Sequence, residues 1–478
     1  MKFKKTILLL LCLVTNISPQ RVLELDEALS IALKESYSIK SASFSLEGSQ
    51  KTLEATKMGL RTSVSMEFDL PRYSRSLQSQ FNTQTASEQF FEVGNTTLEG
   101  RLYFTQPIPF TNGTFSLVSS IFGRDQFSGI TGTSRDYYTN MSLRLRQPLF
   151  TFNSLSASLE RAEINLEKSK RNFSRAEHDL IYNVTSSFYQ LFQAKRNMEI
   201  VQERVNQTTI SYETAMNKYK AGLLAEVEAL QLEVELASAK NELLNAETRF
   251  REAKDNIKIL IGLPIDEDID VAAELEYKPV KIDVEHAVQS ALDNRPELHN
   301  AGADINLSSL TVDEVSSKGN INAVLQANYG INKNDDDFKD LFHAFAEDRS
   351  VSFTVALPVW DWGKNSREVE SAEANLKLSV LTFENLKEQI KKEIITLVNK
   401  IESSRARVEV LTKSVEVARK SYEISTARFE AGNITSFDLS QTQLRLTDAQ
   451  TNSLNALIDY KLAIADLKRK TFFDYERQ

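Results

Sequence analysis

Two short stretches, Gln147-Pro148-Leu149-Phe150 and Leu357-Pro358-Val359-Trp360, each close an apolar strand-like segment and precede a long helical pattern. The two helical patterns end at similar turns, Tyr219-Lys220-Ala221-Gly222 and Phe429-Glu430-Ala431-Gly432. From Pro148 to Gly222 is 74 positions, and from Pro358 to Gly432 is also 74. At about 1.5 Å per residue, each helix is on the order of 100 Å long. Matched helix lengths are needed by a tube or rod whose walls end at one height, and the core of an enzyme does not need them.

The duplication extends in both directions along the chain. Upstream, residues 28–33 (A-L-S-I-A-L) resemble residues 287–292 (A-V-Q-S-A-L) at an offset of 259 positions. The offset at the prolines and glycines is 210, so the first half carries 49 additional residues before Pro148. Downstream, each glycine opens another helical pattern, and the first of these ends at L-I-G-L-P, residues 260–264. The chain is therefore predicted to be a tandem repeat.

This pattern predicts a signal peptide at 1–20, a first repeat at 21–264, a linker or equatorial segment at 265–281 and a second repeat at 282–478. In the first repeat we expect a helix, strands at about 61–149, a long helix at about 153–221 and a helix at about 223–261. In the second we expect a helix at about 283–318, strands at about 320–359, a long helix at about 364–431 and a helix at about 433–470.

The N-terminus has the features of an export signal. Lys2, Lys4 and Lys5 precede an apolar run at residues 7–14 that is too short to span a bilayer as a helix. The only cysteine, Cys12, lies inside this run. It is either a lipidated N-terminal cysteine or an ordinary residue that is removed with the signal. In the second case the mature protein has no thiol, and disulfides are excluded.

Composition narrows the class of protein further. The chain of 478 residues has a formal net charge of −9, and 26% of its residues are charged. This acidic balance argues against a nucleic-acid partner. No segment after the signal has eighteen consecutive apolar residues, so no transmembrane helix is predicted.

The strand-like segments alternate apolar and polar residues with period two. Residues 62–70, 98–104, 141–146, 321–331 and 350–359 all show this alternation. It fits a half-buried strand of a soluble sheet or of a membrane barrel, and the export signal and long helices favour the barrel. In the additional segment, the turn at Asn112-Gly113 predicts a hairpin within about 97–122. This hairpin either joins the barrel wall or packs elsewhere. Three polar segments, 73–94, 123–136 and 332–348, are predicted to be loops.

The long helices carry a coiled-coil pattern. From Leu155, apolar or small residues recur at alternating steps of four and three, with one additional step of four between 180 and 184. This is a heptad pattern with one stutter, and several seam positions are small, such as Ala162, Ser169 and Ala176. Small seams allow helices to pack side by side at close distance.

An opening A-L-x-x-A-L helix, a strand closing in Q-P-L-F, a long helix, an A-G-L turn and a closing L-x-G-L-P resemble the TolC-like outer-membrane efflux proteins. The resemblance covers about residues 25–470 and occurs twice. It implies a mainly α fold with a membrane β-barrel portion, in which a homotrimer forms a twelve-stranded barrel with four strands per chain. A periplasmic α-helical coiled-coil barrel continues it. The implied function is the exit duct of a tripartite efflux pump or type I secretion system.

The same resemblance implies the partners: a periplasmic adaptor, an inner-membrane transporter of the RND or ABC type, and outer-membrane lipid. It also implies residues at the closed periplasmic end, where the hairpin turns would meet the adaptor. These tip residues are Gly222, Leu223, Gly432 and Asn433. Pro148 and Pro358 mark the strand-to-helix turns.

Five further residues are expected at the periplasmic aperture. Asp438 stands at the family's acidic ring position, with Gln441 where a second acid occurs. Phe429 matches a latching aromatic residue, Ile434 replaces a latching arginine, and Glu228 matches the acid with which that arginine pairs. The alternative for Asp438 and Glu228 is that they are exposed acids at helix N-termini, which interact with the helix dipole.

No catalytic motif, cofactor motif or metal-ligand spacing is found, so the protein is not expected to be an enzyme. His178 is expected to be solvated, and the triplet at residues 335–337 is expected to be a solvated loop. Two alternative functions are a periplasmic coiled-coil adaptor and a trimeric surface structural protein. Neither requires two matched 74-residue spans with twin turns.

Overall fold

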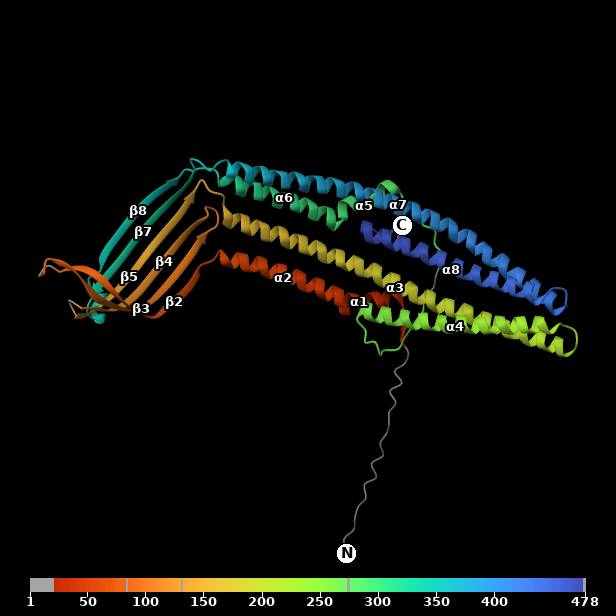
Figure 1. The fold of residues 1–478 in the computed structure, drawn as a ribbon. Helices are drawn as coiled ribbons and strands as arrows, with labels where there is room; N and C mark the ends of the chain where they lie inside the picture. Colours follow the sequence, from red (N-terminus) through yellow and green to blue (C-terminus); the bar gives the residue numbers. More distant parts are fainter. Residues whose placement is uncertain (1–20, 83–84, 130–131, 273–275, 476–478) are drawn as a thin grey trace, which may run out of the picture. The chain divides into compact units, whose positions relative to one another are not determined.

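The computed structural model describes residues 21–82, 85–129, 132–272 and 276–475 (Figure 1). The expected signal peptide, including Cys12, lies outside these residues. The chain divides into two compact units. The helical unit comprises the chain up to Phe44, Asn172–Pro296 and the chain from Leu386 onward, and the mixed unit comprises Ser45–Arg171 and Glu297–Asn385. Each unit takes segments from both repeats, so the repeats are not separate folding units.

Four helices carry the duplication most clearly. Helices α3 (Ser154–Lys220) and α7 (Lys364–Glu430) each have 67 residues, and α4 (Glu226–Ile261) and α8 (Ser436–Thr471) each have 36. These bounds lie within about three residues of those expected from the sequence. Among the described residues, no helix has the length and hydropathy needed to cross a membrane.

The opening segment of each repeat forms two helices where we expected one. The first repeat has α1 (Leu25–Glu35) and α2 (Tyr37–Gly59), and the second has α5 (Val284–Asn294) and α6 (Pro296–Ser317). Arg295 is extended (ψ +122°) because a residue before proline is disfavoured in the helical region. Ser36 breaks the first repeat at the equivalent place without a proline (ψ +136°).

A small parallel pair organises the core of the helical unit. Strand β1 (Arg21–Leu23) pairs with β6 (Ile269–Val271), which lies within the expected linker. Lys195 binds both carboxylate oxygens of Asp270 at 2.8 Å. Burial opposes ionisation of this carboxyl, but the hydrogen bonds from Lys195 and Val271 N, together with the charges of Lys195 and Lys254, outweigh it and lower the pKa of Asp270. Around the pair lie apolar residues that are buried or nearly so: Leu23, Ala28, Leu180, Val184, Phe188, Leu191, Ile257, Ile261 and Ile269.

The mixed unit contains a single sheet in the order β2-β3-β4-β5-β7-β8. All neighbouring strands are antiparallel, and the β5–β7 ladder joins the two repeats. A 3-10 helix, η1 (Phe338–Phe342), precedes β8. The strands are β2 (Ser63–Asn82), β3 (Ser87–Ile108), β4 (Gly113–Ser128), β5 (Gly132–Leu149), β7 (Asn322–Asp335) and β8 (Ala346–Ala356).

The count of six strands corrects the four strands per chain that the resemblance implied. The additional hairpin is present, with Asn112 in the left-handed region (φ +58°) at its turn, and β3 and β4 pair along their length inside the sheet. The first repeat thus supplies four strands and the second supplies two.

Of the three polar segments expected to be loops, residues 332–348 lie mostly outside the strands and contain η1. The other two are largely strands: β2 and β3 occupy most of residues 73–94, and β4 and β5 occupy most of residues 123–136. Cross-strand ion pairs replace apolar alternation there: Arg75 pairs with Glu92, and Arg124 pairs with Asp136 at 2.9 Å. Such pairs stabilise a ladder without an apolar face, which is why the sequence pattern missed them.

The sheet has one apolar and one polar face over the half that adjoins the helices. Phe104, Leu117, Leu143 and Tyr329 form one cross-strand row of the apolar face. On the opposite face, Arg101 contacts the carboxylate of Asp69 at 3.0 Å and also pairs with Glu99. Directly paired residues lie on the same face, so each face continues across all six strands.

We predict that Gly262→Ala destabilises the helical unit far more than Gly222→Ala does. Both glycines have positive φ (+84° and +73°), but a Cβ at Gly262 would lie 2.5 Å from the carbonyl oxygen of Glu35, whereas a Cβ at Gly222 meets nothing within 4 Å. We expect losses of about 3 and about 1 kcal/mol, because only the first adds a backbone clash to the left-handed strain. Thermal loss of helical circular dichroism measures both, and equal losses would show that the Glu35 contact is not decisive.

Candidate functional site

The two hairpin turns have the same geometry. Gly222 and Gly432 have φ of +73° and +75°. Leu223 N donates to Lys218 O at 2.8 Å, and Asn433 N donates to Arg428 O at 2.8 Å. These are Schellman bonds, in which a left-handed glycine ends a helix. Leu223 and Asn433 are both exposed, so the turns present one apolar and one amide side chain to the surroundings.

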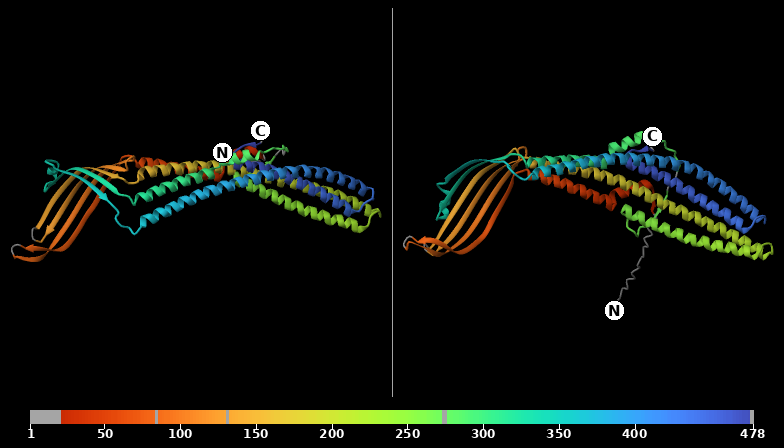
Figure 2. Two further views of the ribbon diagram at one scale, coloured as in Figure 1. Left: turned by 90° about the horizontal axis from the view of Figure 1, so that it is seen from above. Right: turned by 45° about the horizontal axis from the view of Figure 1, so that its top comes forward.

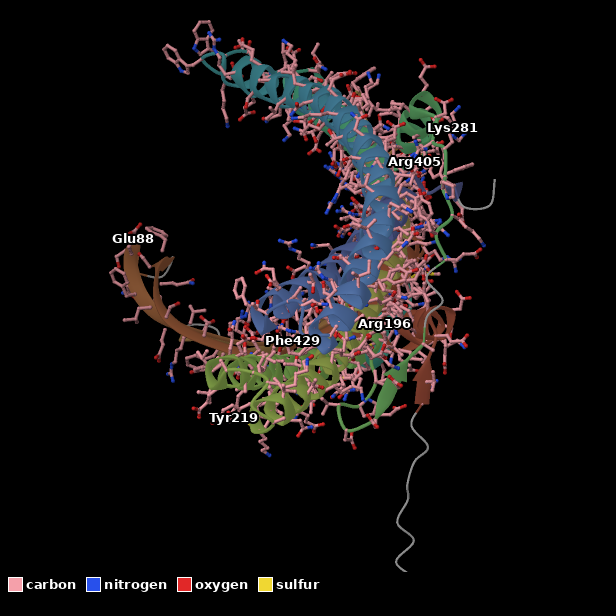
Figure 3. All side chains as sticks on the ribbon, turned by 90° about the vertical axis from the view of Figure 1, so that its right-hand side faces the viewer. Glu88, Arg196, Tyr219, Lys281, Arg405 and Phe429 are labelled. Carbon is pink, nitrogen blue, oxygen red and sulfur yellow. The ribbon has the colours of Figure 1, made fainter. Side chains whose placement is uncertain are left out.

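The two hairpins pack against each other within one chain. Phe429 is 2% exposed and belongs to a cluster against which Ile434 packs. Figure 3 labels Phe429 near the end of α7 and Tyr219 near the end of α3. The two residues expected at the latch, Phe429 and Ile434, are therefore brought together. The buried members of the cluster are Ala215, Ala229, Leu232, Phe429 and Leu439.

A lysine that the sequence did not single out ties the first hairpin to the second. Lys218 Nζ donates to the carbonyl oxygens of Phe429 (2.6 Å) and Glu430 (3.0 Å). Its ammonium also lies 5.0 Å from the centre of the Phe429 ring. A cation at a helix C-terminus interacts favourably with the helix dipole and its free carbonyl groups. Lysine near a helix end is common, so the sequence offered no signal for a tie to another hairpin.

Glu228 makes a second tie between the same hairpins. Its carboxylate accepts a hydrogen bond from Ser436 N at 3.3 Å, at the start of α8. No arginine is needed for this contact, because the positive end of a helix dipole takes its place. Glu228 therefore contacts the other hairpin, and its partner is a backbone amide and not the side chain of Ile434.

Asp438 stands at the repeat position equivalent to Glu228 but binds its own helix. Its carboxylate accepts from Thr435 N (3.2 Å) and Thr435 Oγ1 (2.8 Å), while Asp438 N donates to Thr435 Oγ1 (3.2 Å). This is a capping box. Asp438 and Gln441, three residues later, are both exposed. Within one chain, Asp438 has the helix-terminal role that the alternative interpretation gave it.

A buried polar group lies farther along the helices. Gln443 is buried, and its amide donates to Arg204 O (3.2 Å) and Thr208 Oγ1 (3.1 Å), joining α8 to α3. The Arg204 guanidinium binds Glu242 of α4 at 2.5 Å. Because an unpaired buried polar group is costly, this arrangement holds three helices in one register.

The strand-to-helix turns expose large aromatic residues. Pro148 lies inside β5, paired with Val324, and Pro358 follows the end of β8. Beyond it, Trp360 and Trp362 meet edge to face at 5.5 Å and are largely exposed. Phe110 and Phe150 are also largely exposed at the same end of the sheet. Aromatic residues at strand ends are typical of the interface between a bilayer and water.

Among the described residues, no cluster of three or more His, Cys, Asp or Glu is arranged to hold a metal ion. Asp337 instead caps η1 by accepting from Lys339 N at 2.9 Å. His178 was expected to be solvated, but its ring packs 4.1 Å from that of Phe472. Burial and the neighbouring charge of Lys468 lower the pKa of His178.

We predict that Lys218→Met loosens the second hairpin. Methionine keeps the apolar stem but loses the donors to Phe429 O and Glu430 O, which together contribute about 1–2 kcal/mol. Amide hydrogen exchange in residues 428–434 should accelerate roughly fivefold to thirtyfold. Lys220→Met, an exposed lysine in the same turn of α3, is the matched control and should change nothing. The same exchange in both variants would contradict the tie.

The fold is that of several solved outer-membrane channels. The Campylobacter jejuni CmeC channel matches with a TM-score of 0.71 and 16% identity, covering 94% of this chain and 85% of that one. The open-state Neisseria gonorrhoeae MtrE channel matches with a TM-score of 0.67 and 15% identity, covering 94% and 88%.

Two curated relatives match in sequence. Nodulation protein T of Rhizobium leguminosarum bv. trifolii is 21% identical over 262 residues, which is 54% of this chain and 53% of the relative. The match thus spans about half of that relative's length. Outer membrane protein TolC of Vibrio cholerae is 20% identical over 323 residues, 65% of this chain and 72% of the relative. The family model described as outer membrane efflux protein matches residues 28–263 and 287–471. The chain therefore belongs to the outer membrane efflux protein family and is a protein of the outer membrane.

Proposed function

We propose that this protein is a homotrimeric channel that forms the exit duct of a tripartite efflux pump or a type I secretion system. The observation that carries the proposal is the sheet, which has one apolar and one polar face and two unpaired edge strands, β2 and β8. In a bilayer, unpaired backbone groups are not tolerated, so such a sheet must close into a ring. One chain of this curvature and width does not close it, and further copies do.

Exposed apolar stripes on the helices support the same assembly. On α7, Val410, Val417 and Ile424 recur every seven residues and are exposed. On α4, Val227 and Val234 do the same. Heptad seams of this kind pack against other helices. Neighbouring copies are the proposed partners, and three copies match the assembly that the family resemblance implies.

The partners proposed at the other end are a periplasmic adaptor and an inner-membrane transporter of the RND or ABC type. The hairpin turns at Gly222, Leu223, Gly432 and Asn433 are the proposed docking points. Leu223 is 76% exposed although it is apolar, and an exposed leucine at a hairpin tip is a suitable anchor for a partner groove.

Deletion of the gene should make its host accumulate dyes and antibiotics that the wild type expels, or retain a protein it normally secretes. The wild-type gene should restore export, and the purified protein should have the native mass of a trimer in detergent. Heat-modifiable migration on gels and recovery in the outer-membrane fraction separate a duct from a soluble adaptor or surface fibre. A monodisperse monomer with folded strands would refute the trimer.

We also propose that three copies of Asp438 line the closed aperture, with Gln441 beside them. Converging carboxylates attract cations, so added divalent or trivalent cations should block conductance from the hairpin side. Asp438→Ala and Asp438→Asn should each raise the half-blocking concentration by about tenfold, since a ring of charge is lost. Asparagine retains the capping bonds to Thr435, so it separates charge from helix stability. Planar-bilayer titration measures this, and unchanged block in both variants leaves Asp438 as a capping residue alone.

A further inference from the structure

Within the mixed unit, four helical segments form a row, and the two outermost segments connect to the two edge strands of the six-stranded sheet. Bonds between side chains order the helices: Ser49 to Ser169 (2.6 Å) joins α2 to α3, Arg161 to Glu314 (2.7 Å) joins α3 to α6, and Ser308 to Ser379 (3.0 Å) joins α6 to α7. Chain connections link α2 to β2 at one edge and β8 to α7 at the other. Figure 2 shows these segments continuing into the sheet.

The two edge strands are complementary in direction. β2 leaves α2 and runs away from the helices, whereas β8 runs toward them and leads into α7. If β8 of one copy lies beside β2 of the next, the two strands are antiparallel, as are all other neighbours in the sheet. All eleven residues of β8 are exposed in the single chain. A second copy of this chain is therefore the occupant that each edge fits.

We propose that β8 of one copy pairs with β2 of the next with Ala356 opposite Ser63, so that each copy adds six strands to the ring wall. This proposal rests on the trimer proposed above. The register places the helix-proximal ends of both edge strands at one level. It also matches the faces: Val355 lies opposite Val64 and Phe353 opposite Met66 on the apolar side, and Thr354 lies opposite Ser65 on the polar side.

The register gives an ordinary strand tilt. A row of directly paired residues crosses the sheet from Ser63 to Ser350 through Thr105, Ser116, Arg144 and Asn328. In the proposed register Ser350 faces Asp69 of the next copy, six residues farther along β2 than Ser63. Six residues of about 3.3 Å over six strands of about 4.8 Å give a tilt of about 35°, within the range of membrane barrels. If β8 is shifted by two residues toward the start of β2, Ala356 pairs with Arg61, which lies outside β2. The strand tilt then falls to about 25°.

The width of the helical layer also accommodates all six strands. Four helices spaced about 8–10 Å apart cover roughly 32–40 Å of arc. Six strands at a tilt of about 35° cover roughly 35 Å, whereas four strands cover roughly 23 Å. The six-stranded sheet therefore continues the helical layer without narrowing.

The consequence is a wide mouth in the outer membrane. Three copies of six strands make eighteen, which corresponds to a backbone diameter of roughly 34 Å, against roughly 22 Å for twelve strands. The face that carries Arg101 and Glu99 would line the opening with charged groups. A mouth of this width suits bulky cargo, including polypeptide segments, as well as small molecules.

Cysteine pairs at the edges test the register, in a background in which the single native cysteine, Cys12, is replaced by serine. Thr354→Cys with Ser65→Cys, and Ser352→Cys with Glu67→Cys, are matched pairs. Thr354→Cys with Asp69→Cys is four residues out of register and is the offset control. Gln326→Cys with Ser352→Cys, which are directly paired within the chain, confirms that the oxidant reaches this face.

Mild oxidation should convert most of either matched pair into covalent dimers and trimers on non-reducing gels, at least fivefold more than the offset pair or the single cysteines. If both matched pairs stay uncrosslinked while the native mass is that of a trimer, the edge register is wrong and the channel proposal stands. Strong crosslinking of the offset pair alone also overturns the register. A monomeric native mass in the wild type refutes the proposed trimer itself.

Discussion

Every backbone N–H and C=O group that enters a bilayer must find a hydrogen-bond partner, and this requirement shapes the chain. The four inner strands satisfy it within the molecule, whereas β2 and β8 each leave one row of groups unpaired. A soluble protein tolerates such edges because water binds them, but hydrocarbon does not. In the proposed trimer, neighbouring copies complete these edges, and the equal lengths of α3 and α7 suit a wall made of repeated copies. A wall made of repeated copies must end at one level.

At the two hairpin turns the contacts are of a different kind. A small apolar cluster around Phe429 and a few polar ties to backbone hold the hairpins together. Each tie contributes on the order of 1–2 kcal/mol, so the contact between the two hairpins is modest in energy. The duplicated acids illustrate how this end is built. Glu228 reaches across to the other hairpin, whereas its repeat equivalent Asp438 caps its own helix, so the two hairpins are not interchangeable.

The two repeats also differ in their contribution to the sheet. The 49 additional residues of the first repeat become a hairpin inside the sheet and not a loop outside it. The additional segment therefore sets the number of strands in one chain, whereas the long helices have the same lengths in both repeats.

The sequence by itself determined the helical part of the protein. Heptad spacing, the glycine turns and the prolines are local signals, and they placed α3, α4, α7 and α8 within about three residues of their observed ends. Pro296 also marks the break before α6, although we expected one continuous helix there. Alternation identified the part of β2, β3, β5, β7 and β8 that adjoins the helices, because one face of the sheet is apolar there.

Only the tertiary structure decided the rest, since it depends on residues far apart in the chain. The outer halves of β2 and β3 mix apolar and charged residues without a clean alternation, and their pairing, with ion pairs such as Arg75 to Glu92, is visible only in the fold. The sheet order and its count of six strands follow from hydrogen bonds between segments that no local period reports. Lys218 had no feature to distinguish it until the fold brought it to the end of α7, 211 residues away from Phe429.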